Sequence, residues 1–414
     1  MSGRGLGIVP CAIFGCMIGA WSVAVADPTS REPAIGAYGP WFAAEVLGDG
    51  PARMSLRTGT WSSVDAWRKA GRERLRELMA PIDLGGQPEV RLDATFEYDG
   101  LHVERLSWQL PDGPRTEAVF LKPAGAQGRL PAVLALHDHG GNKFLGWRKI
   151  ARVEADQPAL VAAHQGQYYE GAAWANELAK RGYAVLVPDT FLFGSRRVRV
   201  ADVPARIRLD ATDPEIDDQE GVKRYNEFAR QHEHVVAKSL FCAGTTLPGV
   251  FVTEDQRALD VLCGRADVDP ERVGACGLSG GGLRTVFLGG LDDRVRCAVP
   301  VGFMTTWRDF SLNRSFTHTW MTYVPGLPRD LDFPEVLALR APAATLVLNC
   351  TEDQLFTLPE MRRADRILRE TFEQAGAADR YRCSFHPGGH KFDRAMQGEA
   401  FDWFDRHLGP AAAR

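Results

Sequence analysis

The sequence lacks the features that mark several large classes of protein. Its 414 residues carry 49 basic and 53 acidic side chains, so a net charge of −4 leaves no positive excess for nucleic acid or an anionic lipid surface. Charged residues make up 25% and hydrophobic residues 45%, which are ordinary globular values and exclude a mostly disordered, collagenous or coiled-coil chain. No internal repeat is visible.

The spacing of the cysteines does not favour a metal. None of the eight cysteines forms a C-x-x-C pair, so zinc or thioredoxin-like chemistry has no support. Four of them lie inside or at the ends of apolar runs, which is typical of small buried residues: Cys276, Cys297, Cys350 and Cys383. An oxidising compartment would permit a disulfide such as one between Cys242 and Cys263.

Residues 1–26 are typical of a secretory signal peptide. Arg4 is their only charged side chain, an apolar stretch follows it, and residues 24–26 supply a small-x-small cleavage site. A retained membrane anchor is disfavoured by Pro10 and several glycines within the stretch. A lipoprotein signal at Cys16 is disfavoured because the apolar run continues well past it. We expect export to the periplasm or the cell exterior, without stable membrane insertion after cleavage.

The pattern of the remaining chain changes near residue 130. Before it, residues 63–79 have the spacing of an amphipathic helix, and three alternating segments are typical of antiparallel edge strands: 91–98, 101–110 and 116–121. After it, short apolar strands alternate with helices. This alternation predicts an α/β fold with a mostly parallel sheet covered by helices on both faces.

We expect one main domain with additions. An N-terminal extension over 27–90, partly helical, is expected to pack on a domain over 91–414 that has insertions near 143–171 and 196–231. Within that domain strands are expected at 132–136, 183–187, 273–276, 297–301, 345–349 and 381–385. Helices are expected at 174–181, 251–262, 361–374 and 401–407.

One motif carries the chemistry. Residues 277–281 match G-x-S-x-G around Ser279, with an apolar strand directly before and a plausible helix directly after. A nucleophile elbow needs this context, because its strained turn exposes the serine hydroxyl. Gly277 and Gly281 are small enough for the strand and the helix to come close. The alternative is a glycine-rich turn that only packs the strand on the helix.

A serine nucleophile needs a base, and the base needs an acid to orient it. In this topology they follow in the order Ser, acid, His. Asp353 follows the strand expected at 345–349, with Glu352 as its competitor. His390 follows the last expected strand, and two glycines before it let its loop fold back over the serine. His386 comes too early and is expected at the end of the strand.

An oxyanion hole needs two backbone donors. We expect one at the N–H of Gly280, directly after the nucleophile. The other is expected in the loop after the strand at 132–136, where His139 is the first choice and Gly140 the second.

The rival interpretation of that loop is a metal site, because His137, Asp138 and His139 offer ligands side by side. No further ligand cluster is obvious. The His-Glu-His segment at 232–234 lies beside the charged insertion and is expected on a solvated helical face. The sequence therefore predicts neither a metal nor another cofactor.

The insertions after the strands are expected to form the substrate pocket, as is usual in open α/β sheets: 143–171, 191–231 and 303–331. Trp307, Trp320 and Tyr323 would line a ring- or sugar-binding cleft, or else form the core of a helical cap. Phe193 is expected to border the site. Arg196 beside it would attract an acidic substrate or, more simply, form a surface salt bridge.

Together these residues resemble the α/β-hydrolase superfamily, within its dienelactone-hydrolase-like and acetyl xylan esterase-like branch. The resemblance covers about 101–409. Its carriers are 136–141, 181–189, 267–274, the Ser279 elbow, 323–327 and the loops of Asp353 and His390. Two departures concern the branch. Dienelactone hydrolases use a cysteine where Ser279 stands, and acetyl xylan esterases commonly carry a glutamine where Gly280 stands.

The resemblance implies a mostly parallel α/β-hydrolase sheet with antiparallel N-terminal edge strands. It also implies a serine hydrolase that cleaves a carboxylic ester through an acyl-enzyme, and the pattern of residues 1–26 adds the expectation that this hydrolase is secreted. The expected substrate is a small-molecule or glycan ester, either an acyl ester of a carbohydrate or a small aryl or alkyl ester, and no nucleic-acid partner is expected. The alternatives are hydrolysis of an amide, peptide or carbon–carbon bond, and a catalytically silent binding module on the same fold.

Overall fold

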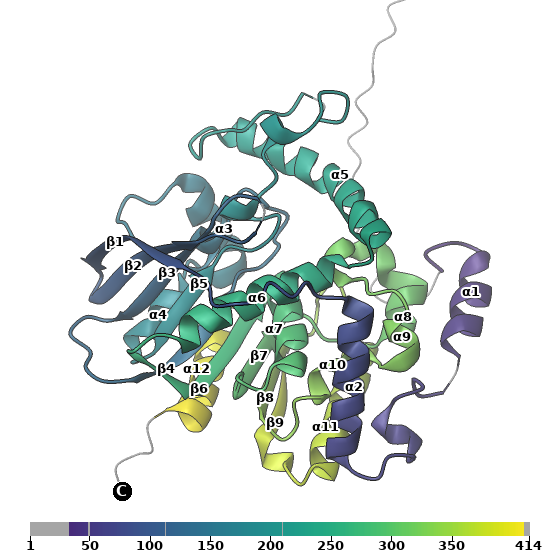
Figure 1. Ribbon diagram of the computed structural model, residues 1–414. Coiled ribbons are helices and arrows are strands. Elements are labelled where there is room, and N and C mark those ends of the chain that lie inside the picture. The colour runs from purple at the N-terminus through teal and green to yellow at the C-terminus, as the bar shows by residue number, and fades with distance from the viewer. Residues whose placement is uncertain (1–32, 49, 112, 209, 410–414) are drawn as a thin grey trace, which may run out of the picture.

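The structure is a computed structural model that describes residues 33–409, apart from positions 49, 112 and 209. The predicted signal peptide lies outside the described residues. The central feature is a nine-stranded sheet in the order β1-β2-β3-β5-β4-β6-β7-β8-β9 (Figure 1). Its strands are β1 (Val90–Tyr98), β2 (Leu101–Trp108), β3 (Thr116–Pro123), β4 (Leu130–Leu136), β5 (Ala184–Pro188), β6 (Val268–Leu278), β7 (Cys297–Val301), β8 (Ala344–Cys350) and β9 (Tyr381–His386).

The sheet combines an antiparallel edge with a parallel centre. β1, β2, β3 and β5 pair antiparallel in succession, whereas every pairing from β5 through β4 to β9 is parallel. The expected edge strands and the six expected central strands are confirmed. Because β5 and β6 lie on opposite sides of β4, the strand order reverses direction at β4. In open α/β sheets the crevice at such a switch point is where ligands bind.

Helices cover both faces of the sheet (Figure 1). They are α1 (Tyr38–Leu47), α2 (Val64–Met79), α3 (Ala159–Tyr169), α4 (Trp174–Lys180), α5 (Gln219–Ala243), α6 (Leu247–Cys263), α7 (Gly280–Leu291), α8 (Trp307–Asp309), α9 (Leu327–Asp330), α10 (Phe333–Ala338), α11 (Leu358–Gln374) and α12 (Arg394–Leu408). Among the described helices none alone has the length and apolar composition of a membrane span, and only α5 with α6, bent by 87°, passes as a pair.

The pleat of β4 shows how the two layers form. Val133 and Ala135 pack on the face that α4 and α12 cover, whereas Leu134 and Leu136 pack with α6 on the other face. Successive side chains of a strand point to opposite faces, so a strand covered on both sides has to be apolar throughout. This is why the sequence shows β4 as an apolar run rather than an alternation.

The cysteines add no covalent link. The six within the described residues are all free thiols, and Cys276, Cys297 and Cys350 are buried as expected. A disulfide between Cys242 and Cys263 is not formed. Cys242 lies exposed near the end of α5 and Cys263 ends α6.

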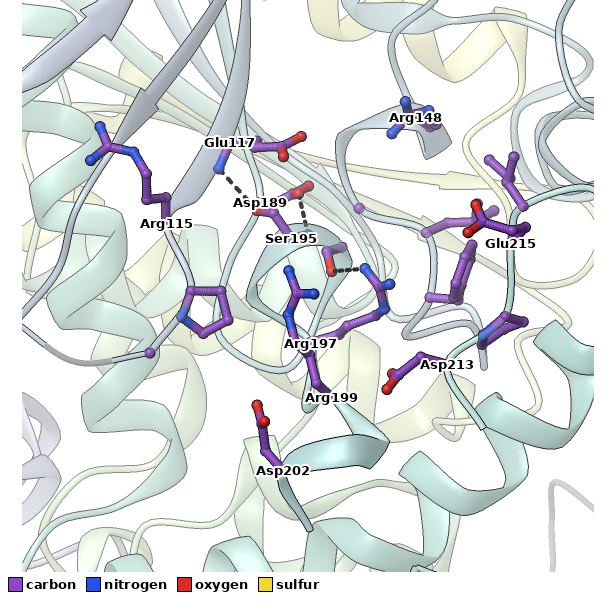
Figure 2. Close-up of a pocket in the computed structure, with 18 of the residues that line it drawn as sticks. Arg115, Glu117, Arg148, Asp189, Ser195, Arg197, Arg199, Asp202, Asp213 and Glu215 are labelled. Atoms are coloured by element: carbon purple, nitrogen blue, oxygen red, sulfur yellow. Dashed lines mark hydrogen bonds between the residues drawn. The ribbon is translucent and has the colours of Figure 1, made fainter. Parts of the chain in front are cut away.

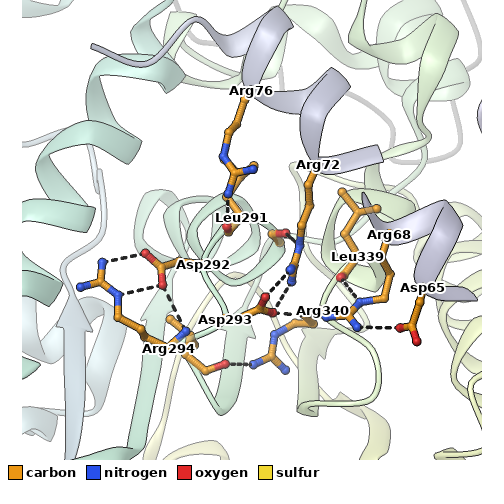
Figure 3. A network of polar contacts seen from close by, with 12 residues as sticks. Asp65, Arg68, Arg72, Arg76, Leu291, Asp292, Asp293, Arg294, Leu339 and Arg340 are labelled. Atoms are coloured by element: carbon orange, nitrogen blue, oxygen red, sulfur yellow. Dashed lines mark hydrogen bonds and ion pairs between the residues drawn. The ribbon is translucent and has the colours of Figure 1, made fainter. Parts of the chain in front are cut away.

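The helix expected at 63–79 is confirmed as α2, and it docks through arginines (Figure 3). Arg72 donates to the Gly290 carbonyl at 2.8 Å and to both carboxylate oxygens of Asp293 at 2.5 and 2.6 Å. Arg76 donates to the Leu291 carbonyl at 2.9 Å. These carbonyls end α7, where a helix carries its partial negative charge, so the cations of α2 stabilise the C-terminus of α7.

The same end of α7 lies against α10. A Cβ placed on Gly290 would come within 2.4 Å of the Val336 carbonyl oxygen, a backbone atom that cannot swing aside. The close packing of these two helices therefore depends on a residue without a side chain at position 290.

We expect Gly290→Ala to lower the free energy of unfolding by about 1–3 kcal/mol, because the methyl group forces α7 and α10 apart. The matched control is Gly398→Ala in α12, where an added Cβ meets nothing within 4 Å. That change should raise the free energy of unfolding by up to ~1 kcal/mol through helix propensity alone. Urea denaturation measures both, and equal effects of the two alanines would contradict the packing argument.

Candidate active site

Ser279 occupies a strained turn between β6 and α7. Its backbone has φ 56° and ψ −117°, a left-handed conformation that residues other than glycine rarely adopt. The turn is held by hydrogen bonds from the Ser279 N–H to the Val301 carbonyl and from the Leu283 N–H to the Ser279 carbonyl, each 2.8 Å. Strain maintained in this way is characteristic of functional sites.

The glycines flanking Ser279 allow an unusually close backbone approach. A Cβ on Gly281 would lie 2.0 Å from the carbonyl oxygen of Leu136 at the end of β4, and one on Gly277 would lie 2.3 Å from the same oxygen. Both distances are far below contact. The small residues that the motif predicts are therefore required by the meeting of β4, β6 and α7.

His390 and Asp353 form the expected acid–base pair. The His390 Nδ1 lies 2.7 Å from an Asp353 carboxylate oxygen, and the Asp353 side chain is 1% exposed. Burial would lower the pKa of His390, but the Asp353 carboxylate outweighs burial and the pKa is raised. His390 is thus paired with Asp353 and not with Glu352. His386 ends β9 and contacts Glu399 at 2.8 Å.

Ser279 and His390 line one cavity of about 450 Å³ at the carboxyl end of the parallel strands. The His390 Nε2 has no hydrogen-bond partner in the described part of the chain, Ser279 included. Such bonds are often long without substrate and tighten only in the reacting complex. The nitrogen that would accept a proton is therefore not engaged by another group.

The expected oxyanion donors lie at the same cavity. A Cβ on Gly280 would come within 3.0 Å of the His139 backbone nitrogen, so these two backbone segments are adjacent. Gly280 is the first residue of α7, where an N–H has no acceptor within the helix. Gly140 has φ 50° and, like His139, lines the cavity. The arrangement offers donors to an anion beside Ser279.

The four aromatic residues expected to bind substrate do not line this cavity. Trp307 is 4% exposed and packs edge-on against Phe333, and the Tyr323 hydroxyl donates to the Ser315 carbonyl. Trp320 packs against Tyr323. For Trp307, Trp320 and Tyr323 the packing favours the alternative of a buried core over a binding cleft.

Phe193 comes from a different segment, directly after β5. It is 2% exposed, and its ring lies 5.3 Å from the rings of both His137 and His139. Phe193 borders the site only through its contact with His139 and has no face open to the cavity.

Other residues form the cavity wall. They come from two of the three expected insertions, 143–171 and 303–331, and from the loop after Asp353. They are Gln167, Tyr168, Phe303, Thr317, His318, Thr319, Met321, Gln354 and Leu355. The sequence identified the segments that form the cavity, because they are long insertions after strands. It did not identify the individual lining residues, because an irregular segment has no helical or strand repeat that shows which side chains face the cavity.

His318 is the most informative of these residues. The Thr317 hydroxyl donates to the Arg314 carbonyl at 2.8 Å, so toward the His318 Nδ1, 2.7 Å away, it accepts. The hydrogen of the neutral ring is therefore on Nδ1, and Nε2 is an acceptor with no partner among the described residues. Burial and the nearby His390 lower the pKa of His318 to about 3, so the ring stays neutral near pH 7.

A larger cavity of about 810 Å³ lies elsewhere (Figure 2). Five arginines and five carboxylates line it, so it has no net charge to favour an anion. Among the described residues that line it there is no histidine, and the one serine, Ser195, accepts the Glu117 N–H at 2.9 Å. Asp189 in its wall accepts backbone N–H groups of Trp147 and Ser195 at 2.7 Å. The strained serine and the histidine paired with a carboxylate both line the smaller cavity.

Within the described residues, no group of three or more histidine, cysteine, aspartate or glutamate side chains is arranged to hold a metal. Asp138 instead accepts hydrogen bonds from His164 and the Tyr169 hydroxyl. The solvated face expected at 232–234 is wrong for Glu233. That carboxylate is buried, pairs with Lys143, and accepts the Trp320 N–H at 2.7 Å.

The surface salt bridge expected for Arg196 is likewise a buried one. Its guanidinium donates to Glu254 at 2.7 Å, and the two side chains are 6% and 5% exposed. The pair joins the segment after β5 to α6, so Arg196 serves the packing of the domain.

Comparison with known proteins bears on the fold. No protein-family model matches the chain. YtaP of Bacillus subtilis (strain 168), which is provisionally named a hydrolase, is 27% identical over 310 residues, or 74% of this chain and 88% of YtaP.

Two solved structures show the same architecture. A protein of Bacteroides fragilis NCTC 9343, provisionally named an acetyl xylan esterase, matches with a TM-score of 0.59 at 18% identity, covering 83% of this chain and 80% of its own. A glucuronoyl esterase from Solibacter usitatus matches with a TM-score of 0.58 at 14% identity, covering 87% and 98%. The chain has the α/β-hydrolase fold, as the sequence predicts.

We expect Asp353→Asn to lower the pKa of His390, because it removes the carboxylate that holds this pKa above its usual value. Glu352→Gln is the matched control, since it removes the neighbouring carboxylate without touching the contact. Histidine side-chain NMR across a pH titration measures the shift. If only Glu352→Gln lowers the His390 pKa, then Glu352 rather than Asp353 is the acid that pairs with His390.

Proposed function

We propose that this protein is a serine hydrolase that cleaves a carboxylic ester. The observation that carries the proposal is the convergence at one cavity of the strained Ser279, the His390–Asp353 pair and two backbone segments with donors for an anion. The hydrolase and esterase names of the similar proteins support the same class.

In the proposed reaction, the Ser279 Oγ attacks the ester carbonyl carbon while the His390 Nε2 takes the hydroxyl proton. Asp353 keeps the hydrogen of His390 on Nδ1 and stabilises the cation that forms. The N–H groups of Gly280 and His139 donate to the tetrahedral oxyanion, and each such donor contributes about 3 kcal/mol. His390 then protonates the leaving alcohol. In the second half, His390 takes a proton from water as the water oxygen attacks the acyl carbon, the bond to the Ser279 Oγ breaks, Oγ regains the proton from His390, and the carboxylic acid leaves.

We further propose that the substrate is an ester of a carbohydrate. The two similar structures are named for esters of sugars or sugar acids. Independently, the Nε2 of His318 is an acceptor in the cavity wall with no partner among the described residues, and a ligand that displaces water from it must offer a donor to keep it hydrogen-bonded. A sugar hydroxyl beside the ester supplies such a donor, whereas a plain alkyl or aryl ester does not.

Export from the cytoplasm is part of the same proposal. Its support is the composition of residues 1–26, with one charged residue, an apolar stretch and a small-x-small site.

A fluorophosphonate probe should label the wild-type protein at Ser279, and Ser279→Ala should abolish both labelling and ester hydrolysis, since no other activated serine lies in the cavity. Ser195→Ala in the larger cavity is the matched control and should label normally. Mass spectrometry locates the label. A matched series of p-nitrophenyl esters and anilides then separates ester from amide preference. Labelling that survives in Ser279→Ala would overturn the proposed nucleophile.

We expect His318→Phe to reduce kcat/KM for an acetylated sugar about 10-fold more than for p-nitrophenyl acetate. The phenyl ring preserves packing among Phe303, Phe310 and Phe356 but removes the acceptor, and one hydrogen bond contributes about 1–1.5 kcal/mol. Each variant is measured on both substrates, so a general loss of folding cancels in the ratio. If His318→Phe leaves the ratio of the two kcat/KM values unchanged, His318 does not accept a hydrogen bond from a substrate hydroxyl.

A further inference from the structure

A buried lysine lies beneath the loop that supplies the second oxyanion donor. Lys149 ends the 3₁₀ turn η2 (Trp147–Lys149), and its side chain is 0% exposed. Its Nζ donates to the carbonyl oxygen of Asp138 at 2.6 Å and to that of His139 at 2.9 Å. The reaction proposed above does not use this ammonium group.

We propose that Lys149 is a positioning residue that aims the N–H groups of residues 139 and 140 into the cavity by holding the carbonyls of their own peptide units. The inference rests on the proposed function. In a planar trans peptide unit the C=O and N–H point in opposite directions. When Lys149 holds the carbonyl on the side away from the cavity, the N–H of the same peptide unit points toward the cavity. The Asp138 carbonyl shares a peptide with the His139 N–H, and the His139 carbonyl with that of Gly140. One cation therefore orients both candidate donors.

The contacts distinguish this role from simple pairing with Asp138. The Lys149 Nζ is 3.9 Å from the nearest Asp138 carboxylate oxygen, much farther than from either carbonyl. The His137 Nδ1 is also 3.0 Å from the Asp138 carbonyl and can only donate to it. The Asp138 carbonyl thus receives two donors, while the Asp138 carboxylate receives His164 and the Tyr169 hydroxyl.

The cation also strengthens the donors that it orients. A cation that donates to a carbonyl oxygen polarises the peptide unit, so the N–H of that unit carries more positive charge. This effect is larger in a buried site than in water. The positive group is fixed before any oxyanion forms, which is the condition for electrostatic stabilisation of a transition state. The Asp138 carboxylate and the Phe193 ring, 4.8 Å from Nζ, offset the cost of burying the ammonium.

The groups around Lys149 give the expected pH dependence. Burial lowers the pKa of Lys149 to about 8. The carboxylates of Asp138 and Asp189 oppose that shift, and the cations Arg284 and Lys143 add to it. The facing side chains His164 and Tyr169 bind Asp138 and not the ammonium. The ammonium is lost as pH rises through about 8, so kcat should fall above that pH, whereas the rise of kcat on the acidic side follows His390.

Lys149→Met tests the inference, and Lys143→Met is the matched control. Lys143 is also a buried lysine after the same loop, but its Nζ binds Glu233 and no carbonyl of residues 138 or 139. We expect similar losses of thermal stability in both variants. Only Lys149→Met should lower kcat, about 100-fold, with KM within about twofold, and only that variant should lose the fall of kcat above pH 8.

Several outcomes would overturn the inference. One is a Lys149→Met protein with native near-UV circular dichroism and a kcat within threefold of wild type; another is an equal loss of kcat in Lys143→Met. If Lys149→Met does not fold, a wild-type kcat that stays constant from pH 7 to 10 overturns it. A wild-type protein that hydrolyses no ester and takes no fluorophosphonate overturns the proposed function as well, whereas the preceding outcomes leave that function intact.

Discussion

The carbonyl oxygen of Leu136 lies where β4, the Ser279 turn and α7 meet, and the geometry of the site depends on that approach. Hypothetical Cβ atoms on Gly281 and Gly277 would lie 2.0 and 2.3 Å from this oxygen. Any larger residue would push β4 away from α7. The loop after β4 would then move away from the first turn of α7, and the N–H groups of His139 and Gly280 would no longer face one anion.

Charge is arranged at both ends of α7. Its N-terminus opens on the cavity, where partial positive charge favours an oxyanion, and its C-terminal carbonyls receive arginines from α2. Beneath the neighbouring loop, the buried Lys149 directs its ammonium at two carbonyls. At the C-terminus of α7 and beneath this loop, cations hold carbonyl oxygens in place without any substrate, and dipoles fixed in advance are what the proposed reaction requires.

The sequence predicted the central strands because burial on both faces leaves continuous apolar runs. It predicted the edge strands from alternation and the helices from apolar residues at helical spacing. It also placed Ser279, Asp353 and His390 in the order that brings them to one edge of a parallel sheet, and the contact of 2.7 Å favours Asp353 over Glu352. It left open whether Trp307, Trp320 and Tyr323 line a cleft or form a core, since an aromatic residue in an irregular segment has the same local pattern in both, and only the structure shows them packed against other rings.

By itself the sequence determined the α/β class, the elbow and the loops that carry the candidate groups. These depend on local periodicity, on glycine at close approaches and on strand order along the chain. Only the tertiary structure decided which side chains form the cavity wall, that Glu233 is buried against Lys143, and that Lys149 reaches the carbonyls of residues 138 and 139. Such contacts depend on the direction of side chains from irregular segments, and that direction is set by three-dimensional packing rather than by any repeat in the sequence.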